Sequence, residues 1–187
     1  MFKKNLFMIL PLTFLFLFTT LAATATAQEH NYVGVKKCGM CHKKDKIGNQ
    51  LKIWKESKHS KAYETLKSEE ADKIAMEKYG KKAVEADECL KCHTTGHGLD
   101  AARFEKSFKI TDGVQCENCH GAGKDYKKKK IMKDHAKSVE NGLTEYADEA
   151  AIEKQCKTCH NEESPTYKEF DFHEMWGKIK HPVPADK

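Results

Sequence analysis

The chain has 187 residues, with 33 Lys and Arg against 28 Asp and Glu, and a formal net charge of +5. Only 39% of the residues are hydrophobic, which is too few to build a large apolar core from side chains alone. The length fits a single domain and leaves little room for a second one.

Residues 1–27 have the features of a secretory signal peptide. Two lysines near the start are followed by an apolar run from Leu6 to Leu21, and Ala25-Thr26-Ala27 offers a small-residue cleavage site. We therefore predict a mature single domain of residues 28–187, located in the periplasm or outside the cell. An uncleaved membrane anchor is the alternative, because the apolar run approaches spanning length. An exported chain without a recognition motif is not expected to bind nucleic acid.

Four copies of the pattern Cys-x-x-Cys-His account for all eight cysteines. This pattern is the attachment signature of c-type haem, in which two thiols form thioethers with the haem and the histidine ligates the iron. We therefore predict four covalently bound haem c groups, numbered one to four in chain order. The cysteines are Cys38 and Cys41, Cys89 and Cys92, Cys116 and Cys119, and Cys156 and Cys159, followed by His42, His93, His120 and His160.

Other uses of paired cysteines explain less of this pattern. A structural zinc site does not require a histidine after every second cysteine. A thioredoxin-type dithiol would need one pair in a βαβ setting, whereas this chain has few strand signals. A disulfide scaffold is compatible with export but leaves the four histidines without a role.

The segments between the motifs predict short helices and loops. No strand alternation persists, so we expect a mainly α fold, a compact multihaem cytochrome in which short helices and loops wrap four haems, with little or no β structure. The close spacing of the second and third motifs predicts that their haems are neighbours. The lysine run from Lys127 to Lys130 is a solvated loop, a docking site for an acidic redox partner, or a set of charges that neutralises haem propionates. Helices are expected over residues 50–66, 69–87 and 147–155, with a break in the second at Gly80. A further helix is expected to place Ile131, His135 and Val139 on one face, and a last helix is expected to begin at Ser164-Pro165.

Six histidines remain outside the motifs and can supply second axial ligands. Histidine on both faces of the iron is common in multihaem electron carriers. His59 and His135 each fall on an apolar face of a predicted helix, and His181 lies at the end of the last one. We expect these three to ligate iron. His30, His97 and His173 are left open.

Several segments together resemble the tetrahaem cytochrome c-554 family. The resemblance covers nearly all of the mature chain and implies a helical wrap around haems in stacked and perpendicular pairs. It further implies His59 as a ligand of the third haem and His181 of the fourth, with His135 the nearest candidate for the first. The segments are Tyr32-Val33-Gly34, Trp54-x-x-Ser57-x-His59-x-x-Ala62, the run from Cys89 to Gly96, the run from Gly113 to Gly121, and Trp176-x-Lys178-Ile179-x-His181.

The predicted function is electron transfer, and no catalytic residue is assigned, because so small a chain leaves little peptide for a substrate pocket. A dehydrogenase or quinol oxidase would donate electrons, and a reductase or another cytochrome would accept them. Two alternatives stay open. One is a subunit of an extracellular cytochrome filament, and the other is a small-molecule reductase acting at an open haem iron.

Overall fold

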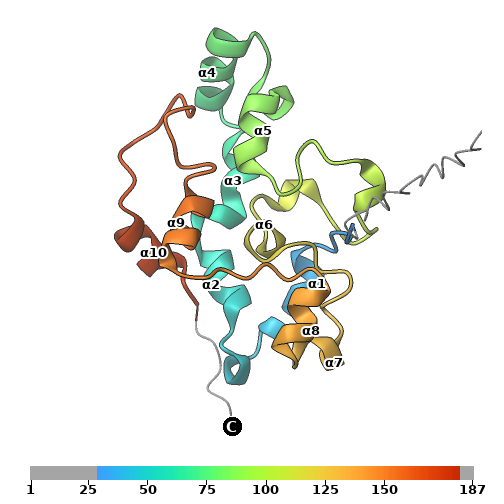
Figure 1. Ribbon diagram of the computed structural model, residues 1–187. Coiled ribbons are helices and arrows are strands. Elements are labelled where there is room, and N and C mark those ends of the chain that lie inside the picture. The colour runs from blue at the N-terminus through green and yellow to red at the C-terminus, as the bar shows by residue number, and fades with distance from the viewer. Residues whose placement is uncertain (1–28, 182–187) are drawn as a thin grey trace, which may run out of the picture.

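The computed structural model describes residues 29–181, so the predicted signal peptide lies outside the described residues. Within this range the chain consists of short helices joined by loops (Figure 1), and its β pairing is one isolated bridge between Tyr32 and Phe104. The mainly α prediction is therefore confirmed. The α-helices are α1 (Val35–His42), α2 (Gln50–Glu56), α3 (Ala62–Thr65), α4 (Glu69–Tyr79), α5 (Asp87–His93), α6 (Cys116–His120), α7 (Lys129–Met132), α8 (His135–Glu140), α9 (Glu149–Cys156) and α10 (Phe172–Ile179). The 3-10 helices are η1 (Asp45–Ile47), η2 (Lys58–Lys61), η3 (Ala83–Glu85), η4 (Ala101–Arg103) and η5 (Ile110–Asp112).

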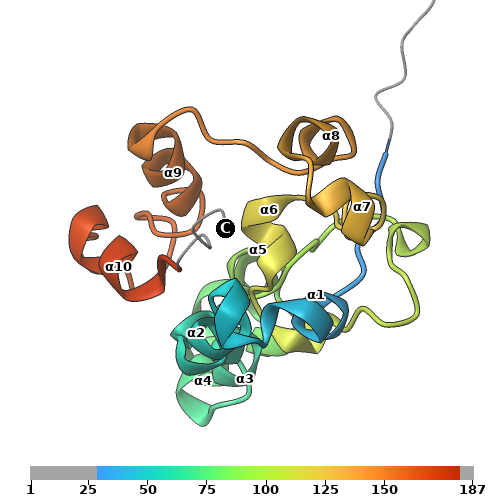
Figure 2. The same ribbon diagram turned by 90° about the horizontal axis from the view of Figure 1, so that it is seen from below.

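Helix α6 lies near the middle of the molecule, between α9 and α10 on one side and α7 and α8 on the other (Figures 1 and 2). The four Cys-x-x-Cys-His motifs occupy α1, α5, α6 and the end of α9 with the turn that follows it. Helix α4 forms one end of the molecule (Figure 1). The motifs are thus distributed around the centre, and the other elements surround them.

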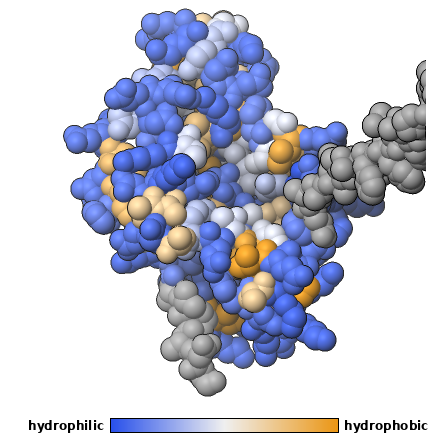
Figure 3. All heavy atoms as spheres, in the orientation of Figure 1, coloured by the Kyte–Doolittle hydropathy of each residue, from blue (hydrophilic) through white to orange (hydrophobic). Residues whose placement is uncertain are grey.

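The apolar side-chain core is small. Among residues 29–181, its compact cluster joins Leu66, directly after α3, with Ala75 of α4 and Ala83 of η3. The face in Figure 3 is mostly hydrophilic, with scattered small hydrophobic spots. Among residues 29–181, no helix is both long and apolar enough to cross a bilayer. The small core agrees with the composition.

The predicted helix over residues 50–66 is divided into α2, η2 and α3. The division falls at Ser57, whose backbone is extended (φ −79°, ψ 161°). The Ser57 hydroxyl donates to the Trp54 carbonyl at 2.7 Å, and the Ser60 hydroxyl donates to the Ser57 carbonyl at 2.9 Å. Serine side chains that bond nearby backbone in this way compete with the helical pattern, which explains the break.

Three further helix boundaries test the sequence rules. Helix α4 ends at Gly80, which adopts the left-handed conformation (φ 68°), as predicted. The expected start of the last helix at Ser164-Pro165 is wrong, because the Tyr167 N–H donates to the Ser164 carbonyl at 3.0 Å and closes a turn there. Helix α10 begins after Asp171, whose side chain accepts from the Glu174 N–H. The face through residues 131–139 is divided between α7 and α8 at Asp134, which caps α8.

Candidate haem sites

Buried polar side chains fix the first motif relative to the third. Glu117, inside α6, is only 2% exposed and accepts three backbone hydrogen bonds. They come from Val33 at 2.8 Å, Gly34 at 2.7 Å and Gly123 at 2.7 Å. Burial raises the pKa of Glu117 above its ordinary value, and the three hydrogen bonds oppose that rise. Because Val33 and Gly34 lead directly into α1, this carboxyl group sets where the first motif begins.

Gln115, directly before the third motif, adds to the same junction. Its side-chain oxygen accepts from the Val35 N–H at 2.8 Å, and its amide nitrogen donates to the Lys109 carbonyl at 2.9 Å. Sequence reasoning gave neither Gln115 nor Glu117 a role. Both are ordinary surface residue types, and no local pattern marks them as buried.

The cysteines of different motifs lie beside one another in pairs. The Cys38 thiol hydrogen-bonds that of Cys116, which lowers the pKa of Cys116. Likewise, a hydrogen bond from Cys92 lowers the pKa of Cys159 to about 6. The first motif is thus next to the third, and the second is next to the fourth. None of the eight cysteines forms a disulfide.

The third and fourth motifs are also adjacent. Burial raises the pKa of Cys119 to about 11, with a further rise from neighbouring Cys156. The expectation from spacing, that the haems of the second and third motifs are neighbours, stays a prediction. The two motifs are joined by hydrogen bonds rather than by thiols: the Gln115 N–H donates to the Thr95 hydroxyl at 2.7 Å, and the Thr95 N–H donates to the Gly113 carbonyl at 3.1 Å. A short connection limits how far two motifs can separate, but tertiary contacts such as those of Glu117 decide which motifs touch.

Two histidine pairs have the geometry of opposite axial ligands. The ring centres of His59 and His160 are 6.1 Å apart, and those of His120 and His181 are 5.7 Å apart. An imidazole nitrogen lies about 2 Å from a metal that it ligates, so histidines on opposite faces of one iron have ring centres about 6 Å apart. The residues present therefore fit bis-histidine haems at the fourth and third motifs. The family resemblance implies the opposite assignment, in which His59 ligates the third haem and His181 ligates the fourth.

The protonation of these histidines suits metal ligation. Burial lowers the pKa of His59, and the neighbouring His160 lowers it further. Burial lowers the pKa of His120 to about 4, with added repulsion from His181 and His42. A histidine ligand must be neutral, so low pKa values favour the ligating form at neutral pH.

Backbone contacts hold His59 in place. The His59 carbonyl accepts from the Val114 N–H at 3.1 Å, and the Trp54 indole donates to the Val114 carbonyl at 2.7 Å. Gly113 has φ +76°, and a Cβ added there would lie 2.7 Å from the His59 carbonyl oxygen. The segment leading into the third motif therefore positions η2 and its histidine, and only glycine permits this approach.

The histidines of the first and second motifs have one ring nitrogen engaged. His93 Nδ1 lies 2.7 Å from the Ala62 carbonyl oxygen, and His42 Nδ1 lies 3.0 Å from the Gln50 side-chain oxygen. With Nδ1 as the donor, Nε2 is the nitrogen left for a metal, which is the usual way an outer contact orients a ligating histidine.

The structure does not bring the remaining histidines to a motif histidine. His135 Nε2 lies 2.6 Å from Glu145, and its side chain is 69% exposed, so its ligand role stays a prediction. His30 Nδ1 lies 2.9 Å from Asp125. His97 Nε2 lies 3.2 Å from Asp87. His173 is exposed on α10.

The fold and these motifs define a c-type cytochrome, a protein with covalently bound c-type haem. The family model "Cytochrome c554 and c-prime" matches residues 37–121. The chain is 31% identical over 154 residues to cytochrome c-554 of Nitrosomonas europaea, an alignment that covers 77% of this chain and 63% of that protein. No solved structure matches. The chain is thus similar to members of the cytochrome c-554 family, and it spans somewhat less than two thirds of the length of this relative.

Proposed function

We propose that the protein is an exported tetrahaem electron carrier. The observation that carries the proposal is the pair of opposed histidines at each of two motifs, His59 with His160 and His120 with His181. Two strong-field imidazoles leave no open position on an iron, which suits electron transfer rather than substrate binding. When bound, the haems supply the redox chemistry, and the chain supplies ligands, spacing and access.

The contacts between motifs support a specific order of the four haems. The first motif touches the third through Cys38 and Cys116, and the second touches the fourth through Cys92 and Cys159. The third and fourth are linked by the neighbouring Cys119 and Cys156. The order one, three, four, two follows, so the first and second haems form the two ends of the chain of cofactors and are the points where electrons enter and leave.

The partners follow from this arrangement. A dehydrogenase or quinol oxidase donates electrons at one end, and a reductase or another cytochrome accepts them at the other. Residues 1–27 would direct export, because they have the composition of a signal peptide. N-terminal sequencing of the exported protein should begin at Gln28, and retention of residue 1 would contradict the cleavage.

The number of haems is tested by the mass of the intact exported protein. It should exceed that of residues 28–187 by four haem groups, and a Cys119→Ser variant should bind haem at the third site less securely. A colourless protein, or one heavier by fewer than four haems, would refute the proposal.

The histidine pairs are tested by electron paramagnetic resonance of the oxidised protein. His59→Ala should convert one low-spin iron to high-spin, because the iron at the fourth motif loses one axial ligand. His173→Ala is the matched control, since His173 is exposed on α10. An unchanged spectrum of the His59→Ala variant would show that His59 is not a ligand.

A further inference from the structure

The segment from Lys36 to Glu56 carries an unusual density of uncompensated positive charge. It contains seven lysines against Asp45 and Glu56, a net +5 over 21 residues, which equals the formal net charge of the whole chain. All seven lysines are exposed, and none forms an ion pair within residues 29–181. We call this set the lysine surface: Lys36, Lys37, Lys43, Lys44, Lys46, Lys52 and Lys55.

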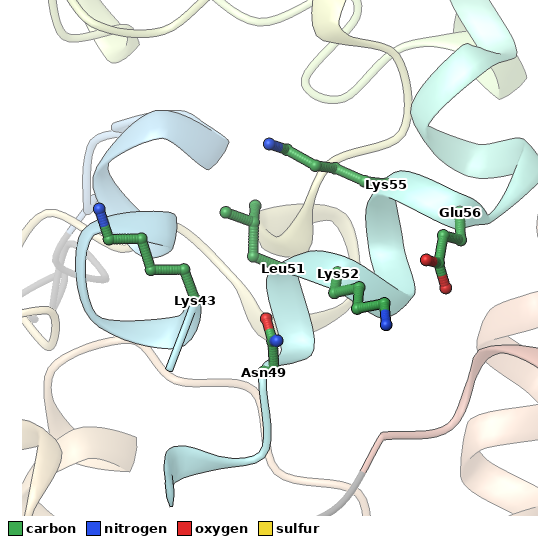
Figure 4. A pocket seen from close by; sticks show the side chains of 6 residues that line it. All are labelled: Lys43, Asn49, Leu51, Lys52, Lys55 and Glu56. Atoms are coloured by element: carbon green, nitrogen blue, oxygen red, sulfur yellow. The ribbon is translucent and has the colours of Figure 1, made fainter. Parts of the chain in front are cut away.

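The lysine surface belongs to one packed unit. Helices α1 and α2 pack closely: a Cβ added to Gly39 in α1 would lie only 2.8 Å from the Leu51 side chain in α2. Lys43, Lys52 and Lys55 line an open hollow of about 380 Å³ beside the first motif. Figure 4 shows Leu51 and Lys55 extending from α2 on the side of α1, whereas Lys52 points away from it. Three of the seven lysines thus line a concave area rather than a flat face.

The other dense basic run is more fully paired. Lys128 lies 4.0 Å from Asp125, and Lys127 donates to the Lys124 carbonyl at 2.8 Å. Lys124 itself pairs with Glu105. In the run from Lys127 to Lys130, which the sequence singles out, Lys128 is the residue with an ion pair among the described residues. The lysine surface is the better candidate for a partner because it gathers, beside the first motif, seven exposed lysines without an ion pair within residues 29–181.

The lysine surface also lies beside one of the two ends at which electrons enter or leave the proposed chain of haems. Met40, in the middle of the first motif, is 62% exposed, and Cys41 beside it is exposed as well. The first motif is one end of the proposed haem order. We propose that the lysine surface is the docking site for an acidic redox partner protein, which exchanges electrons with the haem of the first motif. This proposal rests on the proposed function.

Charge complementarity is what selects this partner. A dense, unpaired basic surface attracts a negatively charged protein before contact and can raise the association rate by about 10- to 1,000-fold, an effect that salt removes. Acidic carboxylates on the partner would then meet the lysines around the hollow. One electron passes from the reduced partner to a ferric haem iron, so the partner is oxidised and the iron is reduced.

The test uses the haem-loaded protein and reduced flavodoxin as an acidic redox probe. Stopped-flow absorbance measures the reduction rate at several salt concentrations. The variant Lys43→Glu/Lys52→Glu/Lys55→Glu should be reduced by flavodoxin about tenfold more slowly at low salt, with little salt dependence remaining. Its reduction by dithionite, a small reductant, should be unchanged. Failure of dithionite to reduce the wild-type haems would contradict the electron-carrier function itself, separately from the docking site.

The matched control carries the same charge change elsewhere. Lys73, Lys78 and Lys82 are exposed and make no ion pair among the described residues, and they lie on or next to α4, at one end of the molecule (Figure 1). Lys73→Glu/Lys78→Glu/Lys82→Glu should change the flavodoxin rate less than twofold. Equal slowing of both variants would overturn the proposal, since net charge alone would then explain the effect.

A second experiment tests whether an anionic membrane, rather than a protein, binds the lysine surface. Vesicles of phosphatidylglycerol and phosphatidylcholine are sedimented with the haem-loaded wild type and the lysine-surface variant. Under the proposal, the two proteins differ in their flavodoxin rates and not in vesicle binding. Vesicle binding that is lost in the variant, with unchanged flavodoxin rates, would assign the surface to lipid headgroups and overturn the proposal.

Discussion

The substitution Glu117→Gln should destabilise the protein although it changes one atom of the side chain. Gln retains one carbonyl oxygen, which can accept two of the three backbone hydrogen bonds that Glu117 receives from Val33, Gly34 and Gly123. Its NH2 group then faces the remaining N–H donor. One buried donor therefore loses its partner.

The magnitude follows from these contacts. A buried donor without a partner costs about 1–3 kcal/mol. The two retained hydrogen bonds change from charge-assisted to neutral, which roughly halves their strength and costs about 0.5–1 kcal/mol each. Removing a buried charge recovers part of this loss. We expect a net loss of about 2–4 kcal/mol, a large fraction of the stability of a typical domain.

The assay is guanidinium unfolding of the haem-loaded protein, followed by far-ultraviolet circular dichroism. Glu162→Gln is the control, because Glu162 is exposed beside the fourth motif and the same substitution should change stability by less than about 0.5 kcal/mol. Equal unfolding midpoints for Glu117→Gln and the wild type would refute the reasoning, since they would mean that the three hydrogen bonds do not hold the first and third motifs together.

Three further outcomes are expected. In voltammetry, His181→Met should raise one midpoint potential, because a thioether stabilises the ferrous iron more than imidazole does; four unchanged potentials would show that His181 is not a ligand. The hydrogen bond to His30 lowers the pKa of Asp125 below 3.8, so its contribution is present above that pH and is lost as the pH falls through the lowered pKa. Asp125→Asn should therefore remove part of the acid-induced loss of stability in chemical unfolding below about pH 4, and equal acid profiles would contradict it. Gly113→Ala should lower the thermal midpoint more than Gly98→Ala, since both have positive φ but only the Cβ at residue 113 would meet backbone, at 2.7 Å.

The sequence predicts the local features better than the long-range ones. The mainly α fold and the end of α4 at Gly80 follow from composition and a single residue type, and the structure confirms both. The division at Ser57 and the turn at Ser164 depend on which hydrogen bond a small polar side chain makes. Serine permits a cap, a break or a turn, and the surrounding structure selects among them.

The arrangement of the motifs is the part that sequence spacing does not determine. His59 lies 101 positions before His160, yet their rings are 6.1 Å apart. Their approach depends on Gly113 and on the Trp54 contact to Val114, neither of which resembles a ligand signal. The motif pattern itself predicts where haem attaches, because that chemistry needs only five consecutive residues.

The contacts of Glu117 have a consequence for the order in which the chain folds. Val33 and the carboxyl group that receives its N–H are separated by 84 positions. The first motif is therefore synthesised well before the residue that anchors it. The first motif can take up its final position only after α6 has formed, because contacts of high sequence separation form late in folding.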